Sequence, residues 1–177
     1  MFLGINHICV VTRDVDRAVR IWADKYGVGP WTVREYPQAS IDVKLGETPT
    51  RFGMRVGLAS INATTRIEII QPTDELSPYA ASLSERGNVD HFHHVRFDVA
   101  DHETSLDRLR AAGLASVMSG VIQSANPEAP CYVDYVDTEA DLGLLIEFAT
   151  LPEGYRLPDP EYVYPEEAGR GAERGRA

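Results

Sequence analysis

HFHHVRFDV, residues 91–99, places three of the five histidines of the chain at the start of an alternating apolar stretch. Alternation of this kind predicts a half-buried strand. INHICVVT, residues 5–12, has the same character, because one histidine is followed by β-branched residues that favour a strand. In both stretches a histidine lies seven residues before an aspartate suited to cap a helix: His7 and Asp14, His94 and Asp101. This repeat predicts two copies of one folding unit.

The order of the predicted elements is the same in both halves of the chain. Each half begins with its histidine strand and a capped helix that ends at a glycine, Gly27 or Gly113. Three more strands follow in each half, at residues 31–36, 53–61 and 65–71, and at residues 115–123, 130–137 and 143–151. We therefore expect an α+β fold in which two tandem βαβββ modules form an open, curved mixed sheet around a cleft. The expected divisions are a first module at 1–72, a linker with a short helix at 73–92, a second module at 93–152 and an extended, flexible C-terminal tail at 153–177.

The composition indicates a globular protein that acts on small molecules. The chain has 177 residues, of which 44% are hydrophobic, so it can bury a sizeable core. Its formal net charge of -10 argues against nucleic acid or an anionic membrane as a partner, since phosphate groups would be repelled. No apolar run approaches the roughly 18 residues of a membrane span, and the first residues lack the pattern of a secretion signal, so we expect a cytoplasmic protein. Cys9 and Cys131 are expected to be free thiols.

Strand alternation places four side chains on one face of the predicted sheet. Side chains two residues apart in a strand share a face, and the helices are expected to cover the more apolar face. The opposite face carries one histidine or glutamate from each of four strands: His7, Glu68, His94 and Glu147. Arg96 shares this face with His94, whereas His93 lies on the helix side and is expected, like His91, to be structural.

Each of these four residues alone would usually be a structural or solvated polar group. Two histidines and two glutamates at matching places in a repeat would converge, however, if the two modules curl into one cleft. Imidazole nitrogens and carboxylate oxygens are ligands for one divalent ion such as Zn, Co, Ni, Mn or Fe. Because no thiolate belongs to this set, we expect a metal site with open coordination positions, which suits Lewis-acid chemistry better than a structural zinc.

Several segments of the chain together resemble the vicinal oxygen chelate superfamily, which includes glyoxalases, bleomycin-resistance proteins and extradiol dioxygenases. These segments are NHICVVTRDVDRAVRIW, YGVGPW, RIEIIQP, SPYAASLSERG, FHHVRFDV and GLLIEFATLP, and they span roughly residues 3–152. The likeness is greatest to the methylmalonyl-CoA epimerase branch. It implies two modules around one divalent metal, with ligands at His7, Glu68, His94 and Glu147, the second of which is often glutamine in the epimerases.

The chain also departs from the epimerases that it resembles. In that branch a further glutamate serves as one of two acid/base groups that exchange a proton on opposite faces of the substrate. The alignment places Arg55 at this position, which argues against two-base epimerisation. An arginine that faces the cleft could instead hold a carboxylate or phosphate of the substrate, although a solvated strand arginine would show the same pattern.

The expected activity is that of a metal-dependent isomerase, epimerase or lyase. Two oxygens of a small carbonyl or acyl-thioester substrate would bind the ion, which would acidify the neighbouring C–H and stabilise the resulting enolate. Glu147 is the expected base, and the candidates for its partner acid are Glu68, Asp98, Tyr132 and Tyr135. The side chains expected to bind substrate are Trp31, Arg55, Arg96 and Tyr132.

Three other functions remain open at this stage. A glyoxalase-like lyase that acts on a thiol adduct would use the same four ligands. A ring-cleaving dioxygenase generally uses two histidines and one carboxylate, so Glu68 counts against it. A small-molecule-binding module of the bleomycin-resistance kind commonly lacks the metal ligands. Members of the superfamily often pair modules across subunits, so we also expect a homodimer.

Overall fold

The two histidine strands lie side by side at the centre of the structure. In the computed structural model, which describes residues 2–166, β1 (Phe2–Val11) pairs in antiparallel fashion with β7 (His91–Val99). His7 lies opposite Arg96 in this pairing. The pair joins the two halves of the chain and brings the histidine of each half to the same part of one sheet.

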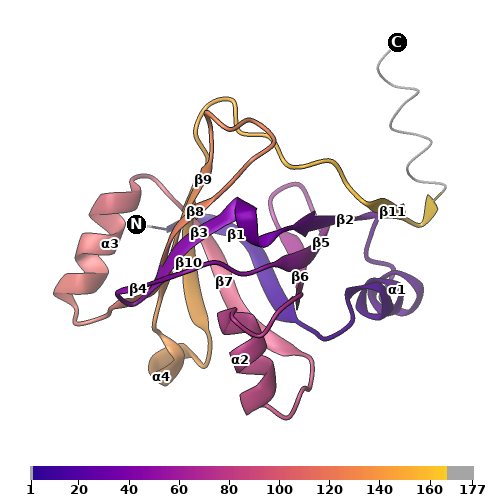
Figure 1. The fold of residues 1–177 in the computed structure, drawn as a ribbon, viewed down its shortest axis with the longest axis horizontal. Helices are drawn as coiled ribbons and strands as arrows, with labels where there is room; N and C mark the ends of the chain where they lie inside the picture. Colours follow the sequence, from indigo (N-terminus) through magenta and orange to yellow (C-terminus); the bar gives the residue numbers. More distant parts are fainter. Residues whose placement is uncertain (1, 167–177) are drawn as a thin grey trace.

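One mixed sheet of eleven strands forms the body of the molecule, in the order β11-β2-β5-β6-β1-β7-β10-β9-β8-β3-β4. Strands β6 and β10 run parallel to β1 and β7, respectively, and the other pairings are antiparallel. The sheet curls into an open half-barrel (Figure 1), which confirms the expected α+β fold with a curved mixed sheet. The strands expected from the repeat are β2 (Trp31–Tyr36), β5 (Met54–Ser60), β6 (Arg66–Pro72), β8 (Ser116–Ile122), β9 (Cys131–Val136) and β10 (Leu145–Thr150).

The two repeat helices, α1 (Val15–Tyr26) and α3 (His102–Ala111), cover the outer face of the sheet. Both begin at the expected caps: the side chain of Asp14 accepts a hydrogen bond from the backbone of Arg17, and that of Asp101 accepts one from Thr104. Helix α1 ends at Gly27, whose φ of 68° is left-handed and favours glycine. The apolar sheet residues that α1 covers include Trp31, Ala59, Ile67 and Ile69.

A short hairpin departs from the expected arrangement of separate modules. After a 3-10 turn at Gln38–Ser40, β3 (Ile41–Leu45) and β4 (Thr48–Thr50) leave the first half, and β3 pairs with β8 of the second half. The sequence analysis predicted no strand here. The alternating stretch is short, and the partner of β3 lies far away in the sequence, so the local pattern could not indicate the pairing.

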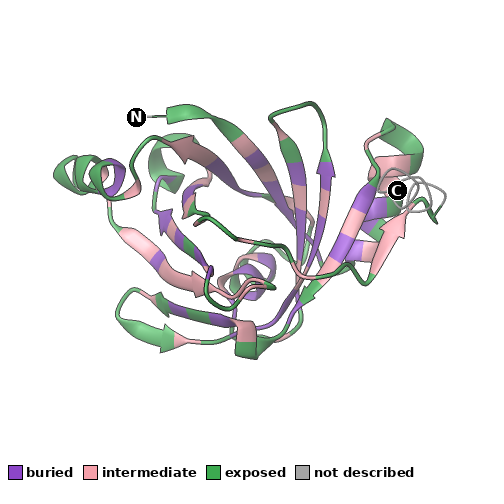
Figure 2. Ribbon diagram, turned by 90° about the horizontal axis from the view of Figure 1, so that it is seen from above, coloured by how far each residue is buried: buried purple, intermediate pink, exposed green. Residues whose placement is uncertain are grey.

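The C-terminal segment is also part of the sheet up to residue 166. Strand β11 (Tyr162–Tyr164) pairs with β2 at one edge, and the segment before it crosses the concave side of the sheet (Figure 2). Leu151, Tyr155 and Leu157 line the central cavity. The tail was expected to be extended and flexible from residue 153 onward. Residues up to 166 are held by strand pairing and packing, and residues 167–177 lie outside the described part of the chain.

The main apolar core fills the concave side of the sheet. Helix α2 (Pro78–Glu85), which is the short helix expected in the linker, contributes Tyr79 and Leu83 to this core. A further one-turn helix, α4 (Glu139–Leu142), precedes β10. Among residues 2–166, no helix is both long and apolar enough to cross a membrane. The concave side is therefore the part of the fold that gathers the side chains expected to carry function.

Candidate active site

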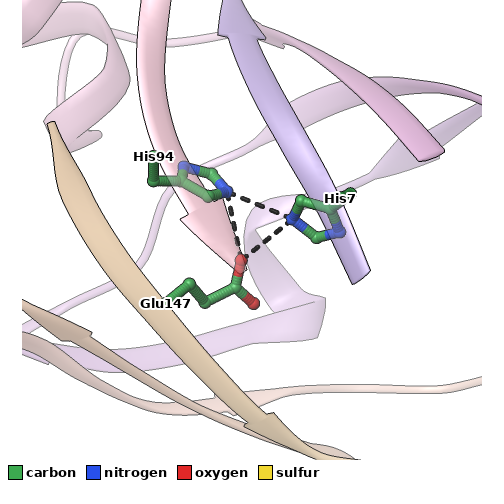
Figure 3. A group of neighbouring side chains, drawn as sticks. All are labelled: His7, His94 and Glu147. Carbon is green, nitrogen blue, oxygen red and sulfur yellow. Dashed lines mark hydrogen bonds and ion pairs between the residues drawn. The ribbon is translucent and has the colours of Figure 1, made fainter. Parts of the chain in front are cut away.

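Two histidines and one glutamate converge on the concave face of the sheet. His7 of β1, His94 of β7 and Glu147 of β10 lie on three neighbouring strands, and all three are buried. Oε2 of Glu147 lies 3.1 Å from Nε2 of His7 and 3.0 Å from Nε2 of His94, and the two nitrogens are 3.3 Å apart (Figure 3). Strand alternation thus places these three donors as the sequence predicted.

Glu68 of β6 supplies the fourth donor of the expected set. Its Oε2 lies 3.4 Å from Nε2 of His7 and 3.4 Å from Nε2 of His94. Glu68 is less deeply buried than the other three, with 15% of its side chain exposed. The two repeats therefore bring all four expected donor residues to one point within a single chain.

The geometry of these donors fits one divalent transition ion. An ion bonded to nitrogen and oxygen at about 2.1 Å holds neighbouring ligand atoms roughly 3.0 to 3.4 Å apart. The distances among Nε2 of His7, Nε2 of His94 and Oε2 of Glu147 run from 3.0 to 3.3 Å, and those from Glu68 to the histidines are 3.4 Å. With two imidazoles and two carboxylates, the donor set is also of a type that such ions accept.

The charges of the four donors are coupled. Burial opposes the ionisation of Glu147, but the hydrogen bonds and charges of His7 and His94 outweigh it, so the pKa of this carboxyl lies well below its ordinary value. Burial likewise disfavours the cationic form of His94, yet its interactions with Cys9, Glu147 and Glu68 raise its pKa well above the ordinary value. The low pKa of Glu147 favours its charged carboxylate, which is the form that a metal ion binds.

Two further side chains, His93 and Cys9, lie next to the four donors. Nδ1 of His93 lies 3.0 Å from Nδ1 of His94, so one ring donates a hydrogen bond to the other and fixes the orientation of His94. Sγ of Cys9 lies within 4.8 Å of the donor atoms of Glu68 and His94. Burial raises the pKa of the Cys9 thiol to about 12, which keeps it neutral. His91 bonds to Ser82, away from the cluster.

A cavity of about 350 Å³ opens beside the donors and is lined by three of them, His7, Glu68 and Glu147. Its other walls are mostly apolar and phenolic: Met54, Val56, Leu58, Ile70, Ile122, Val133, Tyr36, Tyr79, Tyr135 and Tyr155. Arg34, Arg66 and Arg96 add positive charge. Arg96 is only 8% exposed, and its buried Nε has no hydrogen-bond partner among residues 2–166. The cavity can therefore hold a small molecule that has polar groups at one end.

Arg55 does not face this cavity, so the expectation that it replaces a cleft-facing base is wrong. Its guanidinium binds Asp16 of α1 at 3.0 Å and Glu161 at 2.9 Å, on the helix side of the sheet. In β5 the inward positions are Met54, Val56 and Leu58, and Leu58 lies directly opposite Glu68. Arg55 is three residues from Leu58, so its side chain points to the other face of the sheet.

Three other expected residues also lie outside the cavity. Trp31 is fully buried under α1, where its Nε1 donates to the carbonyl of Val28. Tyr132 points away from the concave face and is 49% exposed, since Cys131 and Val133 take the inward positions of β9. Asp98 accepts hydrogen bonds from Asn6 and does not line the cavity.

Several cavity residues were missed by the sequence analysis. Tyr79 comes from the linker helix and Tyr155 from the segment predicted as a tail, so neither belongs to a repeated strand. Met54 and Val56 would have been found by counting inward positions of β5 from the hairpin pairing with β6. Of the four residues expected to bind substrate, only Arg96 lines the cavity.

Comparisons with known proteins agree with this geometry. Residues 6–132 match the model of the Glyoxalase/Bleomycin resistance protein/Dioxygenase superfamily, which is more than half of the chain. The ethylmalonyl-CoA/methylmalonyl-CoA epimerase of Cereibacter sphaeroides is 25% identical over 116 residues, which cover 66% of this chain and 75% of the relative.

Solved structures of methylmalonyl-CoA epimerases show the same fold. The enzyme of Mycobacterium tuberculosis is 22% identical, with a TM-score of 0.62 over 85% of this chain and 89% of its own. A variant of the Streptomyces coelicolor enzyme, solved in complex with 2-nitronate-propionyl-CoA, is 20% identical, with a TM-score of 0.62 over 89% of this chain and 100% of its own. The chain belongs to the Glyoxalase/Bleomycin resistance protein/Dioxygenase superfamily, and its expected likeness to the methylmalonyl-CoA epimerase branch is confirmed.

Proposed function

We propose that this chain is a metal-dependent enzyme that removes a proton from the carbon next to a carbonyl group of a small acyl thioester, as an isomerase or epimerase does. The observation that carries the proposal is the convergence of His7, Glu68, His94 and Glu147 beside a cavity of about 350 Å³. The curated relative, an acyl-CoA epimerase, supports the same class of substrate.

The four donors would hold one divalent ion of the Zn, Co, Ni, Mn or Fe group. When bound, such an ion would act as a Lewis acid toward substrate oxygens and would make the neighbouring C–H more acidic. His93 keeps His94 oriented toward the other donors. The apolar walls around Ile70 and Val133 exclude water from the reacting carbon, which strengthens the electrostatic interactions there.

Glu147 is the proposed base. Its Oε2 faces both histidines, whereas its Oε1 forms no hydrogen bond or ion pair with any residue in the range 2–166. This second oxygen is therefore available to take a proton from the substrate. Glu68, on β6 at the other end of the four strands, is one of the residues expected from the sequence as the partner acid.

Tyr135 is the proposed partner acid. Its ring lies 4.9 Å from the ring of His94, and its hydroxyl is 2.9 Å from that of Tyr79. Burial raises the pKa of Tyr135 well above its ordinary value, so the hydroxyl stays protonated and can return a proton to the substrate. Glu68 and Glu147 are the only carboxylates among the described residues that line the cavity. Both belong to the proposed donor set, so no further carboxylate among these residues can serve as a second base on the opposite face of the substrate. We therefore expect hydrogen exchange to be faster than inversion at the reacting carbon.

Deuterium exchange tests the proposal directly. The metal-loaded protein, incubated in D₂O with a 2-methylmalonyl thioester, should incorporate deuterium at C2, as measured by mass spectrometry above the uncatalysed background. Glu147→Gln keeps the size of the side chain but removes its basicity, so exchange should fall by at least about 10²-fold. The matched control is Glu139→Gln, an exposed residue of α4 that pairs with Arg86, which should exchange like the parent.

Two results would change the assignment. If Glu147→Gln loaded with metal exchanges as fast as the parent, Glu147 is a ligand and not the base. If the parent binds metal but exchanges no hydrogen in a panel of acyl thioesters and 2-keto acids, the proton-transfer proposal is wrong. A thiol-adduct lyase, a dioxygenase or a binding module then becomes the better hypothesis.

The homodimer and the cytoplasmic location stay predictions. The four donors meet within one chain, so the site itself does not require a partner subunit. Light scattering at micromolar concentration measures the assembly: a mass near 19.6 kDa would exclude the dimer.

A further inference from the structure

Arg96 is a buried cation that forms no ion pair within 4.0 Å in the part of the chain that the structure describes. It lies on β7, directly opposite His7 on β1 and beside Glu147 on β10. It is only 8% exposed and lines the cavity, and its Nε has no hydrogen-bond partner among residues 2–166. None of the ion pairs within 4.0 Å in this part of the chain includes it. An arrangement of this kind is costly, because a buried charge loses its hydration.

The position of the guanidinium separates it from the metal donors. Its strand neighbour Glu147 turns its Oε2 toward the two histidines and forms no ion pair with Arg96. The side chain of Arg96 lines the cavity together with Cys131 and Tyr155. Cys131 belongs to β9 and Tyr155 to the segment that crosses the concave side. The cation therefore lies in the cavity beside the donors and outside their set.

We infer that Arg96 forms an anion subsite, and that the molecule processed in this cavity carries a carboxylate that Arg96 binds. This inference rests on the proposed function, since it concerns the substrate of the same site. A guanidinium matches a carboxylate through two parallel N–H···O bonds, and it stays charged at every physiological pH.

Charge balance favours a carboxylate over a phosphate group. One guanidinium neutralises one negative charge, and Arg96 is the only arginine of the cavity that is fully buried, since Arg34 is half-buried and Arg66 is exposed. Glu68 and Glu147 line the same cavity and would repel a dianion. The subsite thus selects an acid with a single negative charge at this point of the molecule, and it discriminates against neutral carbonyl compounds.

A binding experiment with propionate and propionamide tests the subsite. The two probes have the same shape, but only propionate carries the charge. The full-length protein, both metal-loaded and chelator-treated, should bind propionate more tightly than propionamide in an NMR titration. Arg96→Met should reduce the propionate affinity by about tenfold to a hundredfold, as expected for loss of a charge-assisted hydrogen-bond pair, and leave propionamide unchanged. Arg66→Gln removes a cation from the exposed rim of the same cavity, and it should change the propionate affinity by less than about threefold.

A second readout reports on Arg96 itself. Its Nε–H signal in a ¹⁵N spectrum, identified by its absence from Arg96→Met, should shift as propionate is added, because the unpartnered Nε–H gains an acceptor. Melting of Arg96→Met should occur at or above the parent temperature, since the variant removes a buried unpaired charge. A fall of more than about 4 °C would assign Arg96 to the stability of the fold and overturn the inference.

The outcomes separate this inference from the proposed function. Unchanged propionate binding in Arg96→Met overturns the subsite. A preference for propionate that disappears with the chelator also overturns it, because the metal ion alone would then bind the acid. Propionate binding that depends on Arg96 in a protein that exchanges no hydrogen supports the subsite and refutes only the proton-transfer proposal.

Discussion

Arg55 and Arg96 lie on strands of the same sheet but face opposite sides of it. On the outer face, Arg55 binds the carboxylates of Asp16 and Glu161, and Tyr162 donates a further hydrogen bond to Asp16. On the inner face, Arg96 is more deeply buried and has no carboxylate partner among the described residues. The outer charges balance one another within the chain, which is how a structural cluster is built. Under the inference drawn above, the inner charge pairs with a carboxylate of the substrate.

The acidic residues of the two faces show the same difference. The carboxylates of the outer cluster bind a cation that is always charged, and they tie α1 and the C-terminal segment to β5. The inner carboxylates, Glu68 and Glu147, form ion pairs only with the two histidines among residues 2–166, although Arg96 is the neighbour of Glu147 across the strand pairing. Arg96 and Glu147 are paired positions on adjacent strands, so an ion pair between them would need no change in the strand order. Under the proposed function, these inner groups would bind a metal ion and a substrate instead.

The largest expected effect concerns the metal. Protein purified without chelator should contain close to one divalent transition ion per chain, and His7→Ala combined with His94→Ala should lower the affinity for this ion by more than about 10²-fold. Elemental analysis after dialysis measures the content. The matched control, His91→Ala combined with His102→Ala, removes two histidines that bond to Ser82 and Asp134 instead. Equal metal content in the two double variants would show that the donor cluster is misassigned.

The second prediction is that substitutions of the two arginines change the free energy of unfolding in opposite directions, or that only Arg55→Met lowers it. Arg55→Met should destabilise the protein by about 1–2 kcal/mol, because Asp16 and Glu161 lose their charge-assisted hydrogen bonds, with the value reduced by their partial exposure. Arg96→Met should leave the free energy of unfolding unchanged or raise it. Urea denaturation of the two variants and the parent gives both values. Destabilisation of both variants by the same amount would remove the distinction between the two faces.

The repeat allowed the main features of the fold to be predicted from the sequence. Matching histidines, helix caps and glutamate strands gave the mixed sheet and the four donors, because side-chain direction in a strand has a strict period of two. The prediction failed at Arg55, because the resemblance to the epimerases placed an outward-facing residue of β5 in the cleft. Alternation in β5 separates Met54 and Val56 from Arg55, but it does not say which set faces inward. That choice follows from the pairing with β6, in which Leu58 lies opposite Glu68.

The cavity was the least predictable part of the site. It depends on residues that come from outside the repeated strands: the linker helix, which brings Tyr79, and the segment that crosses the concave side, which brings Tyr155 and Leu157. The composition of that segment, rich in proline, glycine and charge, is typical of a flexible tail. Its position is fixed by β11 and by the Arg55–Glu161 pair, and these are long-range contacts that no local pattern encodes.

The smallest expected effect is a difference in acid sensitivity between the two arginine variants. The hydrogen bond from Arg55 holds the pKa of Asp16 below its ordinary value and outweighs the opposing effect of burial. A carboxyl whose pKa is lowered in the folded state stabilises the protein above its unfolded pKa of about 3.9, and this contribution is lost as the pH falls through the lower folded value. The free energy of unfolding, measured with urea from pH 6 down to pH 3, should therefore fall less steeply for Arg55→Met than for the parent. Arg96 has no carboxylate partner among residues 2–166, so Arg96→Met should keep the slope of the parent. If the free energy of unfolding falls equally steeply with pH in all three proteins, the Arg55–Asp16 pair is too solvated to stabilise the fold. The contrast between the two faces would then rest on the inner cluster alone.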